Sequence, residues 1–434
     1  MCGIIGYSGP KEPLPILISG LSRLEYRGYD SAGVALIDGD NLSIEKKEGK
    51  LSVLKEHLEG TSIKGNIGIG HTRWATHGVP SDVNAHPHAD NANEFAIIHN
   101  GIIENYAELK DDLIQDNYSF ISETDTEVVA VELSRKWNGE LLDTVLDVAK
   151  SLDGTYALVV TSTKQPGTIV AGRMMSPLVL GVGEGEVFLA SDSAAILEYT
   201  NKMIFLENGD FVEINDGNFT LYDIEKNVIT RDIQVIDWEV SEAEKAGHDH
   251  FMYKEILEQA EVIERTIAGR IEKNSTEIPI HLDKAKKFEK IWIVACGTAY
   301  HAGLFGKDLF EKVLGVPVSV ELASEFRYRE PIIGKNDLAI VISQSGETMD
   351  TIAATELLKE NGSHVLALVN VVGSSLARMA DSVFYLHVGP EIGVASTKAY
   401  LGMLVGQLLL AKHWDSNNKL DLSLIHISEP TRLS

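Results

Sequence analysis

The residue with the clearest chemical potential stands at the start of the chain, which begins Met1-Cys2-Gly3-Ile4-Ile5-Gly6. If Met1 is removed, Cys2 becomes the first residue and carries both a thiol nucleophile and a free α-amine. An α-amine has a pKa of about 7.7–8.0, so it can accept the thiol proton near neutral pH without a separate histidine base. Without other information, an isolated Met-Cys start more often places an ordinary small residue in a first strand.

Further segments supply the other groups that a cysteine acyl-transfer site needs, namely an oxyanion hole and charges that hold the substrate. The side chain of Asn100 and the backbone N–H of Gly101, which follow a short apolar run, could form an oxyanion hole. Arg73 suits a bidentate pair with a carboxylate, and Asp125 suits an ammonium. Together they match the two charges of an α-amino acid. Taken singly, Arg73 could form a surface salt bridge and Asp125 could cap a helix.

Several histidines in the same region raise the question of a metal site. They are His77, His86, His88 and His99. The His86-Pro87-His88 spacing matches no zinc signature, so we interpret it as structural. We expect neither a metal nor an organic cofactor.

A second set of polar residues occupies two turns in the C-terminal half. Residues 295–300 (ACGTAY) and 343–348 (SQSGET) each follow a buried apolar run and precede a helical pattern. At the carboxyl ends of parallel strands, hydroxyl groups and helix N-terminal N–H groups form a phosphate cradle. Neither turn matches G-x-x-x-x-G-K-[ST] or G-x-G-x-x-G, which disfavours nucleoside triphosphates and dinucleotides. Gly181, Gly183 and Gly185 lack a βαβ context and indicate a hairpin.

Short apolar runs separated by Gly, Asn and Asp predict strands through residues 1–238. They lie at 33–37, 67–70, 95–98 and 156–160. Helical patterns over 124–136 and 141–151 interrupt these runs. We therefore expect a layered α+β architecture in which helices cover the sheets.

The pattern changes after a polar stretch at 239–249, which we interpret as a linker. An apolar stripe then predicts one helix, through Ile256, Ala260, Ile263, Ile267 and Ile271. Continuous apolar strands at 291–295, 338–342 and 365–369 alternate with helical patterns. This alternation predicts a parallel, doubly wound α/β domain.

Composition limits the class of protein. The chain has 434 residues, enough for two or three domains, and a net charge of -26. So acidic a chain is a poor nonspecific ligand for nucleic acid or anionic membranes. No secretory leader and no membrane span are predicted. The two cysteines, Cys2 and Cys296, suggest no disulfide framework, so a reducing cytoplasm is the expected compartment.

Taken together, the N-terminal motifs resemble the class II glutamine amidotransferase domain, an N-terminal-nucleophile hydrolase with α/β/β/α layers. The matching segments span most of 1–238 and are 2–6, 24–33, 71–78, 99–101 and 123–127, and segment 25–33 resembles the glucosamine-6-phosphate synthase family in particular. The resemblance implies that Cys2 attacks the glutamine amide and that Asn100 and Gly101 hold the oxyanion. The roles it implies for the remaining residues are glutamine binding by Arg73, Thr76, His77 and Asp125, ordering of the site by Arg27, and gating of ammonia by Trp74.

The second half resembles the sugar isomerase (SIS) domain of the same family over about 285–415. This resemblance implies a sugar-phosphate site in the two turns and in segment 391–398. The residues it assigns there are Cys296, Gly297, Thr298, Ser343, Gln344, Ser345, Thr348, Val394 and Ser396. Position 299 is Ala in this chain and usually Ser in the family, so one hydroxyl contact is expected to be missing.

We therefore expect an amidotransferase domain at 1–238, a linker and connecting helix at 239–284, a first SIS domain at 285–420 and a non-native tail at 421–434. The implied reaction converts glutamine and fructose 6-phosphate to glutamate and glucosamine 6-phosphate, in a homodimer. The family has a second SIS domain, so we expect this chain to be complete only for the glutaminase half. Two alternatives stay open: another class II amidotransferase, such as amidophosphoribosyltransferase or asparagine synthetase, or a non-catalytic sugar-phosphate sensor.

Overall fold

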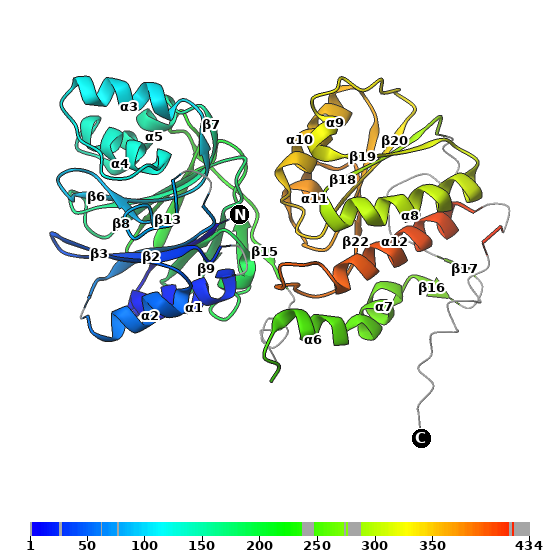
Figure 1. Ribbon diagram of the computed structural model, residues 1–434, viewed down its shortest axis with the longest axis horizontal. Helices are drawn as coiled ribbons and strands as arrows, with labels where there is room; N and C mark the ends of the chain where they lie inside the picture. Colours follow the sequence, from blue (N-terminus) through cyan, green and yellow to red (C-terminus); the bar gives the residue numbers. More distant parts are fainter. Residues whose placement is uncertain are drawn as a thin grey trace. The chain divides into compact units, whose positions relative to one another are not determined.

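The computed structural model describes residues 2–25, 28–61, 63–75, 78–236, 247–272, 275–276, 288–415 and 419–420. The chain divides into two compact units, Met1–Ala243 and Glu244–Ser434 (Figure 1). Most of the predicted linker and all of the predicted tail at 421–434 lie outside the described residues. No described helix is long and apolar enough to cross a membrane.

Two sheets form the centre of the first unit. The larger sheet has the order β15-β11-β9-β10-β1-β4-β2-β3. Its strands are β1 (Gly3–Ser8), β2 (Ser31–Asp38), β3 (Asn41–Glu48), β4 (Ile67–Arg73), β9 (Val179–Val182), β10 (Val187–Ala190), β11 (Lys202–Phe205) and β15 (Gln234–Val235). The smaller sheet has the order β14-β13-β12-β8-β7-β6-β5. Its strands are β5 (His88–Ala89), β6 (Phe95–Ile103), β7 (Gly154–Ser162), β8 (Thr168–Met174), β12 (Phe211–Asn215), β13 (Asn218–Tyr222) and β14 (Val228–Ile229).

Helices cover the outer face of each sheet. The larger sheet is covered by α1 (Pro13–Leu24) and α2 (Leu51–Glu59), with the 3-10 turn η2 (Ser193–Ala195) beside α1. The smaller sheet is covered by α4 (Asp125–Arg135) and α5 (Leu141–Ala149), and α3 (Tyr106–Gln115) packs against α4 (Figure 1). A separate apolar core fills the space between the sheets. The predicted α/β/β/α layering is confirmed.

Successive side chains of β1 point to opposite faces of the sheet, and both faces are buried, so the strand is apolar on both. Ile4 belongs to the core between the sheets, whereas Ile5 and Tyr7 pack beneath α1. All four strand predictions in this unit are confirmed, and the glycine run at 181–185 lies in the hairpin of β9 and β10. Two predicted ends were wrong, because β4 continues to Arg73 and β6 continues to Ile103. Backbone pairing with neighbouring strands extends both beyond their apolar runs.

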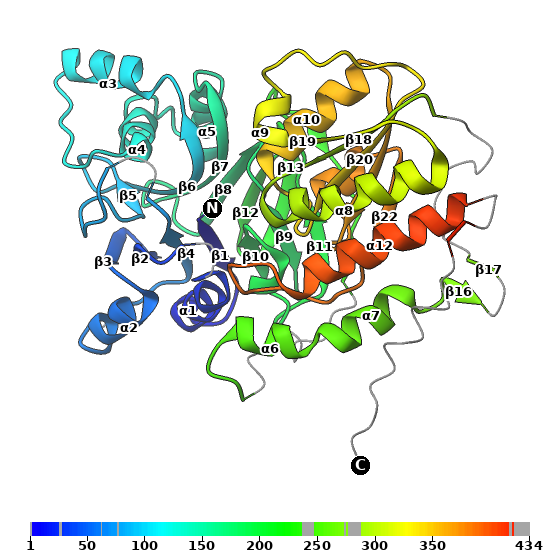
Figure 2. The same cartoon turned by 45° about the vertical axis from the view of Figure 1, so that its right-hand side comes forward.

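The second unit contains a five-stranded parallel sheet of order β19-β18-β20-β21-β22. Its strands are β18 (Ile291–Ala295), β19 (Val318–Leu322), β20 (Leu338–Ser343), β21 (His364–Val369) and β22 (Ser382–Tyr385), and a separate hairpin pairs β16 (Ile271–Glu272) with β17 (Ser275–Thr276). One face packs against α8 (Gly297–Leu314) and α12 (Lys398–Trp414), which lie side by side in Figures 1 and 2. The other face meets α9 (Ala323–Phe326), α10 (Met349–Glu360) and α11 (Ser375–Met379). The predicted doubly wound α/β domain is confirmed.

Strand order creates a switch point between β18 and β20. From β18 the chain passes through α8 to β19 on one side, and β20 is followed by β21 on the other side. Neighbouring connections that diverge in this way leave a crevice at the carboxyl ends of the two strands. Both polar turns predicted from the sequence begin there, at Cys296 and Ser343.

The single connecting helix predicted through Ile256 and Ile271 was wrong. The segment forms two helices, α6 (Phe251–Leu257) and α7 (Gln259–Ile267), with a break at Glu258 between them, and Ile271 lies in β16. Ile256 is exposed, whereas Glu255 is buried. The polar side of α6 faces inward because backbone N–H groups of the second unit donate to the Glu255 carboxylate.

Candidate active site

Cys2 lies immediately before β1, at the edge where β1 pairs with β4. The register places Gly3 opposite Thr72, so Cys2 comes next to the end of β4. The Trp74 backbone N–H donates to Cys2 Sγ at 3.2 Å, and the thiol lies 3.6 Å from the Trp74 carbonyl O. A backbone donor therefore faces the sulfur.

The surroundings of the Cys2 thiol disfavour its ionised form. Although the residue is partly exposed, burial of the thiol raises its pKa above the usual value, opposed by the Trp74 backbone N–H and the positive charge of Arg73. A raised pKa leaves the resting thiol protonated at neutral pH. A nucleophile in this state needs a base close by, which a free α-amine on Cys2 would supply.

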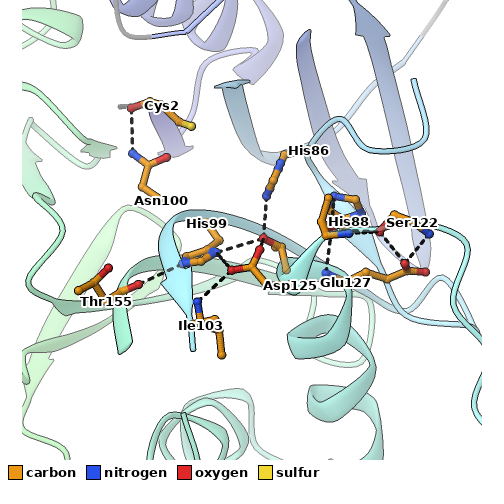
Figure 3. Close-up of polar contacts among 12 residues, drawn as sticks. Cys2, His86, His88, His99, Asn100, Ile103, Ser122, Asp125, Glu127 and Thr155 are labelled. Atoms are coloured by element: carbon orange, nitrogen blue, oxygen red, sulfur yellow. Dashed lines mark hydrogen bonds and ion pairs between the residues drawn. The ribbon is translucent and has the colours of Figure 1, made fainter. Parts of the chain in front are cut away.

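Asn100 contacts the same residue from β6. Its Nδ2 donates to the Cys2 carbonyl O at 2.9 Å (Figure 3), and its Oδ1 lies 3.0 Å from His71 Nε2. The neighbouring Gly101 has φ of +133°, and a Cβ there would collide with the Thr155 carbonyl O. Glycine is therefore required at 101, where the strand departs from regular geometry beside the nucleophile.

Arg73 and Asp125 lie on opposite elements of the same site. Arg73 ends β4 and is 3% exposed, which contradicts a surface salt bridge; its guanidinium donates to the Gly78 carbonyl O at 3.2 Å. Burial lowers the Arg73 pKa, while the charges of Cys2, Asp125 and Asp30 raise it. The guanidinium thus remains a cation held among these groups.

Asp125 is the first residue of α4 and not its cap. The N-cap is Thr124, whose side chain accepts from the Glu127 N–H. The Asp125 carboxylate accepts the Ile103 N–H at 2.9 Å and lies 3.9 Å from His99 Nδ1 (Figure 3). The positive end of the α4 dipole stabilises a carboxylate at this position, and that carboxylate can pair with an ammonium.

Three predicted residues, Arg27, Thr76 and His77, lie outside the described residues. Trp74 is 41% exposed and its ring meets Tyr29 edge-on, with centroids 5.3 Å apart. Its predicted gating role stays a prediction.

A buried histidine cluster lies behind Asn100. His71 stacks on His86 at 4.3 Å, and His86 meets His88 edge-on at 4.7 Å. His86 Nε2 and His99 Nδ1 both contact the Thr126 hydroxyl, at 2.8 and 3.1 Å. Burial lowers the pKa of His71 to about 3 and the pKa values of His86 and His88 well below 6.5. Among the described residues no group of three or more His, Cys, Asp or Glu side chains could hold a metal.

Sequence reasoning did not single out His71. It lies within β4 two residues before Arg73, and all seven residues of that strand are buried. A histidine in such a strand could have indicated a polar partner in the core.

The two polar turns of the second unit meet at the β18/β20 edge. Ser343 accepts the Gly346 N–H at 3.0 Å, and its hydroxyl lies 2.9 Å from that of Thr348. Ser345 accepts the Glu347 N–H at 3.1 Å. These bonds shape residues 343–348 into a compact turn that also contains Gln344.

The opposite turn begins at Cys296, the N-cap of α8, with Gly297 at φ +55° and Thr298 following in the helix. An 18-residue helix starting at this edge directs its N-terminal N–H groups into the crevice. Ala299 is 7% exposed and packs into the apolar core.

Val394 and Ser396 lie on the segment between β22 and α12. Val394 is 70% exposed, and among the described contacts Ser396 bonds to neither turn. Glu255 Oε1 accepts the N–H groups of Ile392 and Gly393 at 2.6 and 2.9 Å. Glu255 is therefore a second functional candidate that sequence reasoning missed.

Glu391 holds the other end of this segment. Its carboxylate accepts the N–H groups of Thr397 and Ala399 at 2.8 and 3.1 Å. Burial raises the Glu391 pKa, which these backbone donors oppose. Two buried carboxylates thus fix the backbone on both sides of Val394.

Comparisons with known proteins agree with both halves. Residues 55–236 match the glutamine amidotransferase domain model, and residues 284–412 match the SIS domain model. The glutamine–fructose-6-phosphate aminotransferase (isomerizing) of Caldanaerobacter subterraneus subsp. tengcongensis is 51% identical over 95% of this chain and 68% of its own length. That of Clostridium tetani is 49% identical over 95% of this chain and 69% of its own length.

The chain belongs to the glutamine–fructose-6-phosphate aminotransferase family. The resemblance stated from the motifs is confirmed. A solved structure described as the C-terminal domain of this aminotransferase from Francisella tularensis is 40% identical, covering 40% of this chain and 51% of that one, with a TM-score of 0.37. In the aminotransferase family the chain thus combines an amidotransferase unit with an SIS unit.

Proposed function

We propose that the chain is a glutamine-dependent amidotransferase that releases ammonia from glutamine at Cys2 and directs it to fructose 6-phosphate, as in the first step of amino-sugar biosynthesis. One observation supports the first half-reaction above all others. Cys2 lies within hydrogen-bond distance of Asn100, so nucleophile and oxyanion donor meet at one place. Substrates, compartment and assembly follow from the family: glutamine and fructose 6-phosphate, a reducing cytoplasm, and a homodimer.

The glutaminase step uses the chain's own groups. With Met1 removed, the Cys2 α-amine takes the thiol proton while sulfur attacks the side-chain carbonyl carbon of glutamine. The carbonyl oxygen becomes an oxyanion stabilised by the Asn100 Nδ2–H and the Gly101 N–H. The α-ammonium returns the proton to the leaving nitrogen, which departs as ammonia and leaves a thioester. Water then hydrolyses the thioester to glutamate and frees the thiol.

Substrate orientation would depend on Arg73 and Asp125. A bidentate guanidinium pair holds the α-carboxylate of glutamine, and the Asp125 carboxylate holds its α-ammonium. These two contacts select an α-amino acid over a simple amide. Arg27, Thr76, His77 and Trp74 keep the roles that family resemblance gives them.

The second unit would hold the sugar phosphate at the switch point. The turn that carries Ser343, Ser345 and Thr348 and the N-terminus of α8 lie at the edge where ligands bind in such sheets. Gln344, Cys296, Gly297 and Thr298 line the same two turns, with Val394 and Ser396 on the adjoining segment.

Two other functions are less well supported. Amidophosphoribosyltransferase and asparagine synthetase would share the first unit, but the SIS unit shows no phosphoribosyl-diphosphate or ATP signature. A non-catalytic sensor would have no use for Cys2, Arg73, Asn100 and Asp125 in one site.

Glutamate release and fructose 6-phosphate binding, measured on the same preparation, test the proposal. Wild-type protein should release glutamate from glutamine, and Cys2→Ala should release none while binding fructose 6-phosphate unchanged in calorimetry. Glutamate release by Cys2→Ala would refute the nucleophile assignment. Absence of fructose 6-phosphate binding by either protein would refute the sugar assignment alone.

A further inference from the structure

His71 connects the oxyanion donor to the interior of the first unit. Its Nε2 lies 3.0 Å from Asn100 Oδ1 and 3.1 Å from the backbone carbonyl O of His99. On its other side, Asn100 donates from Nδ2 to the Cys2 carbonyl O at 2.9 Å. A continuous chain of hydrogen bonds therefore runs from His71 through Asn100 to the backbone carbonyl of Cys2.

Hydrogen-bond chemistry permits only one arrangement of protons along this chain. A backbone carbonyl accepts and never donates, so the carbonyl of His99 requires a hydrogen on His71 Nε2. That hydrogen also faces Asn100 Oδ1, which accepts it. The carbonyl of Cys2 independently requires that the amide atom facing it is Nδ2. Both ends give the same orientation of the Asn100 amide.

This orientation matters because Nδ2 has two hydrogens. One is used on the Cys2 carbonyl O, and the second remains for the developing oxyanion of the substrate. A flipped amide would place Oδ1 toward the nucleophile, where it would repel the oxyanion. Selecting the orientation before substrate binds is the preorganisation on which oxyanion holes depend.

The surroundings of His71 keep it in the required form. The residue is fully buried, stacks on His86, and its Nδ1 has no hydrogen-bond partner among the described residues. With Nδ1 bare, the imidazole is neutral and carries its only proton on Nε2. All seven residues of β4 are buried, and the stacked ring of His86 covers one side of the imidazole.

We propose that His71 is a positioning residue for the glutaminase reaction, which fixes the side-chain amide of Asn100 with Nδ2 toward Cys2 and the substrate oxyanion. This inference rests on the proposed glutaminase function. It assigns His71 no contact with substrate and no proton transfer.

Two substitutions of His71 distinguish the effect of its Nε2–H donor from the effect of the ring's volume. His71→Leu removes the donor and keeps a buried apolar side chain, whereas His71→Gln places an amide N–H near the position of Nε2. His71→Leu should lower kcat for glutamate release by about 10- to 100-fold, below the loss from removing an oxyanion donor outright. KM for glutamine should stay within about threefold, and His71→Gln should recover most of kcat.

A double-mutant cycle with Asn100→Ala tests whether the effect passes through Asn100. In the Asn100→Ala background, His71→Leu should cost less than about twofold in kcat, because no amide remains to orient. The matched control is His88→Leu, since His88 is buried in the same cluster but bonds to Thr124 at 3.1 Å. It should destabilise the fold while leaving kcat within about threefold.

A crystal structure of His71→Leu gives a readout that needs no activity. The Asn100 amide should leave the Cys2 carbonyl O, beyond hydrogen-bond distance. An unmoved amide, or an equal loss of kcat in both backgrounds, would overturn the proposal. An inactive wild type would refute the glutaminase function, and the structure would still decide whether His71 positions Asn100.

Discussion

Glu255 on α6 binds the backbone of Gly393, which lies 138 residues later, at 2.9 Å. The same carboxylate accepts the Ile392 N–H at 2.6 Å, and a Cβ on Gly393 would overlap it. A helix outside the sheet thus holds the segment that presents Val394 and Ser396. The Glu255 carboxylate thereby fixes the backbone of residues 392–393, which belong to no β-strand.

Replacing Glu255 should therefore weaken the sugar site. Glu255→Ala leaves two backbone donors without their partner and loosens residues 392–396, so the Kd for fructose 6-phosphate should rise by about tenfold, or ~1.4 kcal/mol. Calorimetric titration measures this change. Glu261→Ala is the control, because its exposed pair with Arg265 at 3.2 Å contributes little. Equal affinities for both variants would show that the clamp does not shape the site.

Gly101→Ala should abolish most glutaminase activity and destabilise the first unit. The added methyl would enter the space of the Thr155 carbonyl O, and a φ of +133° is strained for alanine. We expect a loss of about 2–4 kcal/mol in the free energy of unfolding, measured by urea denaturation. Gly139→Ala is the control, because Gly139 also has a positive φ, +106°, but a Cβ there would meet nothing within 4 Å. It therefore distinguishes the cost of backbone strain from the cost of the steric clash. Similar losses in the two variants would argue against a steric role for Gly101.

Acid should destabilise the first unit through its buried histidines. His71, His86 and His88 are buried and neutral, with folded pKa values lowered to about 3 for His71 and well below 6.5 for the others. The unfolded chain binds these protons at a pKa of about 6.5, so stability is fully present above that pH and falls as the pH decreases toward the folded pKa values. Each histidine contributes a slope of up to ~1.4 kcal/mol per pH unit.

Urea denaturation between pH 7 and pH 5 measures this slope. His88→Leu, which removes one of the three protons taken up, should flatten it by about one third at the most acid values. A slope that is the same in wild type and variant would mean that His88 is not neutral in the folded protein.

Met1 should be absent from the mature protein. A peptide bond to Met1 would leave Cys2 without the free α-amine that serves as its base, and burial already keeps the thiol protonated. Mass spectrometry of the purified chain measures the terminus directly. Full glutaminase activity in protein that retains Met1 would exclude the α-amine as base.

Much of this protein was determined by local sequence. The apolar runs at 33–37 and 291–295 predict strands correctly because a strand buried on both faces must be apolar throughout. Cys2 stands out because a thiol lies at the start of the chain, and Asn100 because an amide follows an apolar run. The two polar turns stand out because their hydroxyl groups come at the ends of buried strands. Chemistry at strand ends can be read from residue type and position alone.

Only the tertiary structure shows which other residues hold these functional groups in place. The extension of β6 through Asn100 depends on pairing with β7, and the role of His71 depends on a strand distant in sequence. The inward face of α6 is polar because Glu255 meets backbone N–H groups far along the chain. Such contacts produce no periodic pattern in the sequence, because each joins one side chain to one partner far along the chain. Each satisfies a buried polar group that has no partner among its sequence neighbours.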